Sequence, residues 1–280
     1  MVPKGQVSLD ITSAAPVPSV SVADHILKIE WAYKRINELD GVIADFLSPK
    51  LKPYTIGVKI NPQTREKIYY AERVSAIPTD VPLLAGDAIQ NLRSALDYLA
   101  CSLVRANGGT VSERTGFPIF KNVPTSKLNK AAFAGKIEGM RNEAKDIIRA
   151  TKPYKGGNDA LWRIHRLNVI DKHQMLQTVG MAIGRFNIGQ HLRATRTGRL
   201  AQATDVWISP SISPSRILLV KQGQELFVDP ADAKINENPD VEFQVALNEV
   251  GLCEGEPLIL VLKQSLNLVR GLLPNFSKFL

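Results

Sequence analysis

The chain has 280 residues, of which 44% are hydrophobic and 22% are charged, and its formal net charge is +8. This length allows one large domain or two small ones, and the composition is that of a globular protein with a core of normal size. No apolar run approaches the roughly 18 residues of a membrane-spanning helix, and the first 20 residues lack the apolar stretch of a signal peptide. We therefore expect a cytoplasmic protein that has no membrane partner.

Cysteine usage and missing motifs exclude several classes of site. Cys101 and Cys253 are the only cysteines, they lie far apart, and neither has a Cys or His neighbour at metal-ligand spacing. This argues against a disulfide framework and against a zinc site. The chain also lacks a phosphate loop, a dinucleotide-binding glycine motif and a G-x-S-x-G nucleophile elbow. The sequence thus predicts neither a bound metal nor a cofactor.

The charges are unevenly distributed along the chain. Between Lys121 and Arg199 there are 16 lysines and arginines against five acids, an excess larger than the net charge of the whole protein. Between Glu225 and Glu256, nine acids accompany Lys234 alone. The basic segment can contact phosphate backbones, or it can consist of solvated helix faces complemented by the acidic segment. Such a split also suits self-association into a homo-oligomer.

The N-terminal third predicts one helix and one hairpin. Residues 1–21, rich in Pro, Ser and Val near their end, read as a flexible leader. Apolar residues then recur at helical spacing from Asp24 to Phe46. Tyr54 to Ile60 and Lys67 to Val74 are rich in β-branched and aromatic residues and flank the turn Asn61 to Thr64, which is typical of a β-hairpin.

The middle of the chain is predicted to be helical. The clearest helix ends where Gly108 and Gly109 stop it, and a short apolar extended piece, Phe117 to Phe120, follows it. The predicted helices are Leu84 to Asn107, Ser126 to Ala134, Glu138 to Ala150 and Asp159 to Gly180.

After Gly184 the pattern changes to short strands punctuated by Pro, Gly and Asn. A terminal helix, Lys263 to Phe279, is predicted with a break at Pro274. The predicted strands are His191 to Thr197, Asp205 to Ser209, Arg216 to Lys221, Gln224 to Val228, Val241 to Asn248 and Leu258 to Leu262.

Helices first and strands afterwards indicate an α+β fold and not a parallel βαβ sheet. We expect a helical N-terminal two-thirds with one β-hairpin, then a mainly antiparallel β part that ends in a helix. The predicted divisions are the leader 1–21, a mainly helical domain 22–185, and a β-rich part with the C-terminal helix 186–280.

The Leu84 to Asn107 helix carries an unusual polar side. Asp87, Asn91, Ser94 and Tyr98 follow one another at spacings of four, three and four, so they lie along one stripe. Beside this stripe, Arg93 and Asp97 are four residues apart and can meet on the helix surface. Carboxylate, amide, hydroxyl and guanidinium groups in this pattern can form a ligand site or an inter-helix hydrogen-bond network.

The Asp159 to Gly180 helix carries a second polar set. His165, Asn168 and Lys172 share one side, and Asp171 and His173 flank them. Histidine exchanges protons near neutral pH, so His165 and His173 join Arg93 and Asp97 as candidate catalytic residues. The ligand-binding candidates are Asp87, Asn91, Tyr98, Asn168, Asp171 and Lys172.

The two predicted polar helices contain motifs that resemble those of a known protein family. The segment from Gly86 to Ala100 (GDAIQNLRSALDYLA), followed by Phe117-Pro118-Ile119 and then Leu167 to His173 (LNVIDKH), resembles a family of uncharacterised bacterial and phage-borne proteins. That family has a GD-x-x-x-N-L-R-x-A-L-D helix and a later L-x-x-I-D-K-H helix. The resemblance covers roughly residues 83–176 and brings no assigned activity.

A weaker resemblance is to the HEPN-type helical ribonucleases, whose motif has an Arg, four to six intervening residues and then a His on one helix. Here Arg93 is the arginine, and Tyr98 stands where the histidine would be. Because the reference pKa of Tyr is about 10, His165 or His173 would have to supply the base. The resemblance implies RNA cleavage, with Arg93 stabilising phosphate charge.

Two hypotheses follow. The first is a non-enzymatic binding or interaction module in which the two polar helices form a packed network or a ligand pocket. The alternative is an RNA-binding protein, with or without ribonuclease activity. Its basic segment Arg193 to Arg199 supplies Arg193, Arg196 and Arg199 for backbone contact, since this segment lacks interleaved aromatics.

Overall fold

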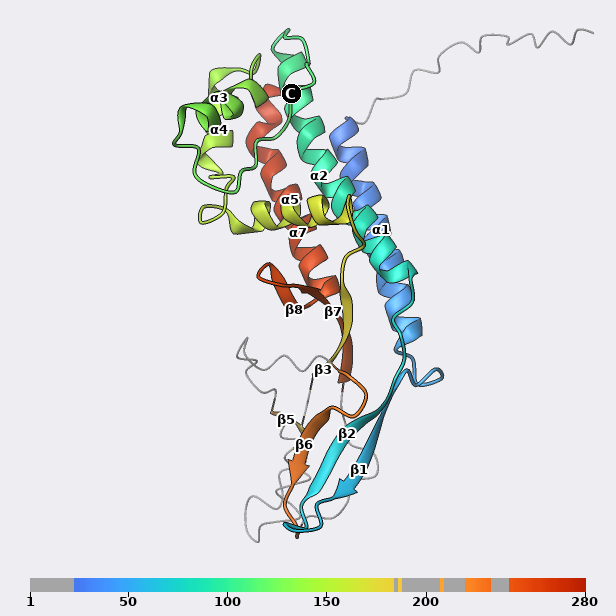
Figure 1. Ribbon diagram of the computed structural model, residues 1–280. Helices are drawn as coiled ribbons and strands as arrows, with labels where there is room; N and C mark the ends of the chain where they lie inside the picture. The colour runs from blue at the N-terminus through green and yellow to red at the C-terminus, as the bar shows by residue number, and fades with distance from the viewer. Residues whose placement is uncertain (1–22, 184–185, 188–206, 209–219, 233–241) are drawn as a thin grey trace, which may run out of the picture.

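The computed structural model describes residues 23–183, 186–187, 207–208, 220–232 and 242–280. Its fold is α+β, with a helical N-terminal part, antiparallel sheets and a helix at the C-terminus, as predicted. The helices gather at one end of the molecule and most of the strands at the other (Figure 1).

Two long helices, α1 (Asp24–Phe46) and α2 (Asp80–Ala106), lie side by side and run in opposite directions (Figure 1). The bounds of α1 match the prediction, because its buried residues repeat every three or four positions, as in Ile29, Ala32 and Ile36. Helix α2 begins four residues earlier than predicted. Pro82 lies in its first turn, where a missing N–H costs no helical hydrogen bond.

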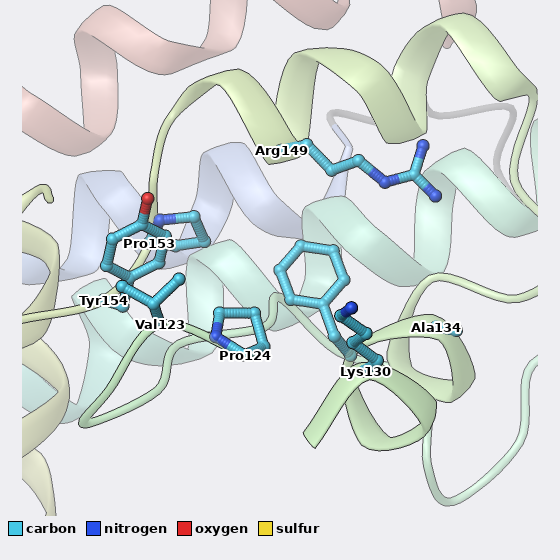
Figure 2. Close-up of a pocket in the computed structure, with 8 residues that line it drawn as sticks. Val123, Pro124, Lys130, Ala134, Arg149, Pro153 and Tyr154 are labelled. Atoms are coloured by element: carbon cyan, nitrogen blue, oxygen red, sulfur yellow. The ribbon is translucent and has the colours of Figure 1, made fainter. Parts of the chain in front are cut away.

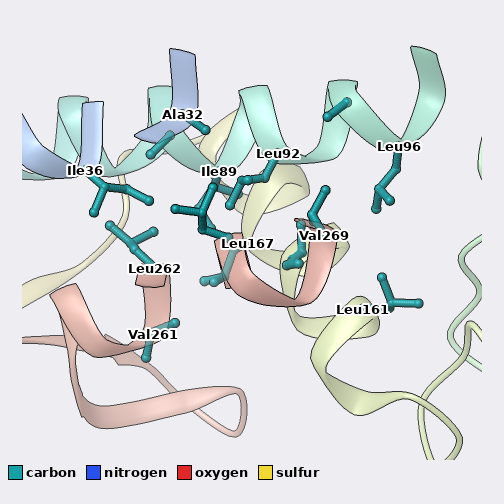
Figure 3. Packing of buried hydrophobic residues seen from close by; sticks show 14 of the residues in the cluster. Ala32, Ile36, Ile89, Leu92, Leu96, Leu161, Leu167, Val261, Leu262 and Val269 are labelled. Carbon is teal, nitrogen blue, oxygen red and sulfur yellow. The ribbon is translucent and has the colours of Figure 1, made fainter. Parts of the chain in front are cut away.

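The remaining helices pack around this pair. Buried residues of α1, α2, α5 and α7 interdigitate in one apolar cluster, part of which is shown in Figure 3. These helices are α3 (Lys127–Lys136), α4 (Asn142–Ala150), α5 (Asp159–Asp171) and α7 (Leu258–Leu272), and a 3₁₀ helix (Leu273–Phe279) ends the chain.

The described strands form three small antiparallel sheets. The predicted hairpin, β1 (Tyr54–Ile60) and β2 (Lys67–Val74), is extended by β6 (Glu225–Asp229). A second sheet has the order β3-β7-β8, and β4 pairs with β5 in a third. The bounds are β3 (Thr178–Ile183), β4 (Phe186–Asn187), β5 (Trp207–Ile208), β7 (Glu242–Glu249) and β8 (Cys253–Pro257).

The helix predicted to run from Asp159 to Gly180 is too long. Helix α5 ends at Asp171, and the chain becomes strand β3 at Thr178. This strand pairs with β7, with Gly180 opposite Val245. The apolar residues near Gly180 therefore belong to a β-sheet and not to the apolar face of a helix. The local spacing of apolar residues alone did not reveal this pairing.

The strand predicted at Leu258 to Leu262 is also wrong, because these residues form the first turns of α7. A short apolar run is compatible with either a buried strand or a buried helix. Here Leu262, Leu266 and Val269 continue the run at helical spacing into the core, which favours the helix. Strand β8 was not predicted.

Some predictions fall outside the described residues. They include the leader, the strand at 191–197 and, apart from Val220 and Lys221, the strand at 216–221. The boundary at 185 and 186 also touches undescribed residues and stays a prediction, although the core cluster draws residues from both sides of it. Within the described ranges, no helix combines the length and the apolarity needed to cross a membrane.

Candidate functional site

The polar stripe of α2 faces α1. The Lys28 ammonium donates to Asn91 Oδ1 at 2.9 Å, across the seam between the two helices. The Asn91 amide donates in turn to the Asp87 carbonyl at 2.8 Å and to Asp87 Oδ1 at 2.7 Å. Because Asn91 is 4% exposed, this network satisfies an otherwise buried amide.

The outer rim of this seam carries aromatic residues beside cations. The Lys28 ammonium lies 5.8 Å from the centre of the Tyr98 ring, and the Arg35 guanidinium lies 4.7 Å from that of Trp31. Arg35 Nε is also 3.9 Å from Asp87 Oδ2. The stripe, predicted as a ligand site or as an inter-helix hydrogen-bond network, is thus engaged with α1 residues that the prediction did not include.

Arg93 and Asp97 form the ion pair that their spacing predicts, with Nη1 and Oδ1 2.8 Å apart. Arg93 Nη2 also donates to the Phe117 carbonyl at 2.9 Å, and the Phe117 N–H donates to Asp97 Oδ1 at 2.9 Å. Arg93 is 8% exposed, and burial lowers the pKa of its guanidinium while Asp97 opposes that shift. We call this arrangement the Phe117 clamp, because both side chains hold the backbone of one residue.

His165 lies close to this clamp. Burial, followed by the positive charges of Arg93, Lys136, Lys172 and Arg166, lowers the pKa of its imidazole to about 4. Its Nδ1 atom is buried and accepts no hydrogen bond from the described residues. The imidazole is therefore neutral at pH 7, and a proton on it would add a positive charge to a site that already holds several.

We expect His165 to make the protein less stable in mild acid. Between its unfolded pKa near 6.5 and its folded pKa near 4, the unfolded chain binds a proton that the folded chain does not. Stability should therefore fall as the pH falls through this window, by about 1–2 kcal/mol once solvent screening of a partly exposed ring is allowed for. Urea unfolding at pH 7 and pH 4.5 measures this loss. The pH dependence should be flatter in His165→Gln, and equal curves for the two proteins would contradict the assignment.

The other candidates on α5 occupy separate environments. Asn168 is buried, and its Oδ1 has no hydrogen-bond partner among the described residues. The Asp171 carboxylate packs against the backbone of Gly86, where a Cβ would overlap it. Burial, with a smaller effect of Asp87, raises the pKa of Asp171. Lys172 and His173 are exposed at the end of the helix.

The predicted site residues thus fall into three groups, the α1–α2 seam, the Phe117 clamp with His165, and the end of α5 from Asp171 to His173; the buried Asn168 belongs to none of them. His173 is not part of the clamp. Arg193, Arg196 and Arg199 lie outside the described residues. In the part of the chain that the structure covers, no three potential metal ligands come together.

A further site, which the sequence analysis missed, is a pocket of about 360 Å³ on another side of α5. We call it the basic pocket. Trp162, Arg166 and Ile170 line it at helical spacing from α5, while Lys121 and Lys155 approach from the loops before α3 and α5. Its lining residues are Lys121, Lys155, Trp162, Arg166, Ile170, Gln174, Gln177 and residues 248–252.

The basic pocket is electropositive. Three cations, Lys121, Lys155 and Arg166, line it against one acid, Glu249. The Glu249 carboxylate is buried and accepts a hydrogen bond from the Gln177 N–H at 2.8 Å. All three cations belong to the basic middle of the sequence, for which both phosphate contact and solvated helix faces were predicted as alternatives. The four-residue spacing of Trp162, Arg166 and Ile170 is the signal that could have located the pocket.

The pocket also offers groups that recognise more than charge. Trp162 is half-buried against the core and presents a large aromatic surface. Asn248 contributes an amide whose Oδ1 is buried and receives no hydrogen bond within the described ranges. Cations, an indole and amides around one cavity can bind a planar ring together with an anion.

Comparison of the chain with protein-family models, with curated proteins and with solved structures found no match.

Proposed function

We propose that this protein is a non-enzymatic binding module that holds a phosphate-bearing ligand of mononucleotide size in the basic pocket. The observation that carries the proposal is the convergence of Lys121, Lys155 and Arg166 on one cavity beside Trp162. Arginine and lysine bind phosphate through charge-assisted hydrogen bonds. The indole ring of a tryptophan can stack on any of the nucleobases.

The size of the cavity supports this proposal. Its volume of about 360 Å³ lies at the lower end of the range of about 300–1,000 Å³ that is usual for small-molecule sites. Glu249 leaves the lining with an excess of positive charge, since three cations face this one acid. Among the described residues, no ion pair engages Lys121, Lys155 or Arg166, which leaves their donors available to a ligand.

Ribonuclease activity, the enzymatic alternative, has less support. Arg93 would have to stabilise phosphate charge, yet its guanidinium is buried and engaged by Asp97 and by the Phe117 carbonyl. Asn91 is likewise engaged by Lys28 and Asp87. These contacts favour a structural role for the α2 stripe, and they leave ligand binding to the basic pocket.

Calorimetric titration of the full chain with UMP and with inorganic phosphate tests the proposal. We expect UMP to bind in about 50 mM salt, where phosphate contacts are strongest, and to bind more weakly as salt is raised. Arg166→Gln should weaken UMP binding about fivefold to tenfold, the value of one good charge contact. Arg114→Gln, the same change at an exposed arginine outside the pocket, is the matched control.

Circular dichroism and thermal unfolding check that both variants fold as the wild type does. Absence of UMP binding in low salt would overturn the proposal. So would an equal loss of affinity in Arg166→Gln and Arg114→Gln, because that would indicate general charge attraction and not a defined pocket.

A further inference from the structure

A second pocket lies next to the basic pocket. It has a volume of about 350 Å³, and Figure 2 shows its lining. Val123, Pro124, Pro153 and Tyr154 gather on one side of it, whereas Lys130 and Arg149 approach from the other (Figure 2). We call it the proline pocket, after its two prolines.

The two pockets share a wall. Phe120 and Tyr154 form a parallel bridge, in which the Phe120 N–H donates to the Pro153 carbonyl at 3.0 Å and the Lys155 N–H donates to the Phe120 carbonyl at 3.3 Å. Neighbouring residues of this bridge line different cavities. Tyr154 belongs to the proline pocket and Lys155 to the basic pocket.

The chain just after Phe120 also contributes residues to both pockets. Lys121 lines the basic pocket, whereas Val123 and Pro124 line the proline pocket. Two residues of chain span at most about 7 Å, so the cavities are separated by little more than one layer of backbone. Because each segment contributes to both pockets, the bridge fixes their distance from each other.

The proline pocket is lined by cationic side chains together with apolar and aromatic ones. Lys130 and Arg149 are cationic, and none of its lining residues is acidic. Arg149 is held by Asp146 at 2.6 Å, whereas Lys130 forms no ion pair with any acid in the described part of the chain. Phe133 is buried there and stacks on Phe120, with ring centres 5.9 Å apart. Aromatic surfaces interleaved with cations are typical of sites that bind single-stranded nucleic acid.

We infer that the two pockets are adjacent subsites for one single-stranded nucleic acid. This inference rests on the proposed function and extends it. One nucleotide occupies the basic pocket beside Trp162, and its neighbour reaches past the shared wall to Tyr154 in the proline pocket. Lys130, the cation that no described acid engages, then meets the second phosphate. A mononucleotide fills the first subsite alone, whereas a longer strand gains the second set of contacts.

Titration with UMP and with hexauridylate separates the two subsites. We expect wild-type protein to bind hexauridylate about tenfold more tightly than UMP, the gain that one additional stacked base supplies. Lys130→Gln and Val123→Asp should weaken hexauridylate binding about threefold to tenfold and leave UMP binding unchanged. Arg166→Gln should weaken both ligands.

Two exposed residues of α3 give matched controls. Lys127→Gln removes the same charge as Lys130→Gln one turn earlier, and Leu128→Asp adds the same charge as Val123→Asp; neither residue lines the pocket. In addition, Lys130→Gln should lower the slope of log affinity against log salt for hexauridylate by about 0.7, the value of one single-strand phosphate contact. Lys127→Gln should leave that slope as it is.

The inference is overturned if the proline-pocket variants affect hexauridylate no more than their controls do. In that case UMP binding that depends on Arg166 still supports the proposed function. If neither UMP nor hexauridylate binds, both proposals fall together. The inference is also overturned if a phosphoserine peptide binds more tightly than hexauridylate and if the proline-pocket variants abolish that binding. The ligand of the two pockets would then be a phosphopeptide and not a nucleic acid.

Discussion

Asp97→Ala should lower the free energy of unfolding by about 3 kcal/mol, because it leaves the Arg93 charge buried without its partner. The substitution also removes the acceptor of the Phe117 N–H, and an unpaired buried donor is itself unfavourable. Asp97→Asn should cost less, since an amide oxygen can still accept that N–H. Urea unfolding at pH 7 gives the values.

Two further variants distinguish the effect of breaking the ion pair from the effect of losing side-chain packing. Arg93→Met combined with Asp97→Ala should recover part of the loss, because the buried charge is then absent. Asp40→Ala removes a half-exposed carboxylate that lies 2.7 Å from the Lys263 ammonium, and should cost about 1 kcal/mol or less. If Asp97→Ala costs no more than Asp40→Ala, the Phe117 clamp does not stabilise the fold.

Gly180→Ala should destabilise the protein by about 2–3 kcal/mol, through overpacking of the junction between helices and strands. A Cβ at this position of β3 would overlap the Tyr54 hydroxyl and stand 2.7 Å from the ring carbon Cζ. The Tyr54 ring cannot move aside easily, because it stacks on Phe243 with centres 4.6 Å apart and meets Phe46 edge-on. Thermal and urea unfolding both measure the effect.

Removal of the Tyr54 hydroxyl should partly compensate for the Gly180→Ala substitution. It is buried without a hydrogen-bond partner in the described structure, and burial raises its pKa to about 12. Tyr54→Phe alone should therefore change stability little, and combined with Gly180→Ala it should restore part of the loss. Gly41→Ala, an exposed helical glycine with open space around it, should instead stabilise by about 0.5–1 kcal/mol. Similar effects of the two glycine substitutions would contradict the packing argument.

Local periodicity determined the elements that the sequence predicted well. The helix at Asp24–Phe46 and the hairpin strands Tyr54–Ile60 and Lys67–Val74 were predicted with their observed bounds. In each of them, the side-chain pattern repeats with the period of the backbone geometry. The Arg93–Asp97 pair followed from the same principle, because residues four apart on a helix are neighbours whatever surrounds them.

Only the tertiary structure decided the features that depend on distant partners. Apolar residues at Leu258 to Leu262 suit either a strand or a helix, and packing against α1 and α2 selected the helix. The end of α5 depends on the pairing of β3 with β7, about 65 residues later in the chain. Similarly, the sequence could place Asp87 and Asn91 on one stripe but could not tell that Lys28 would face them.

The candidate site shows the same division. The cations of both pockets come from the basic middle of the sequence, which the sequence alone could assign either to phosphate contact or to solvated helix faces. Their convergence depends on the bridge between Phe120 and Tyr154, which joins two loops more than 30 residues apart. Charge is additive along a sequence, whereas a pocket needs side chains from several elements to meet at one place, and that meeting is set by long-range packing.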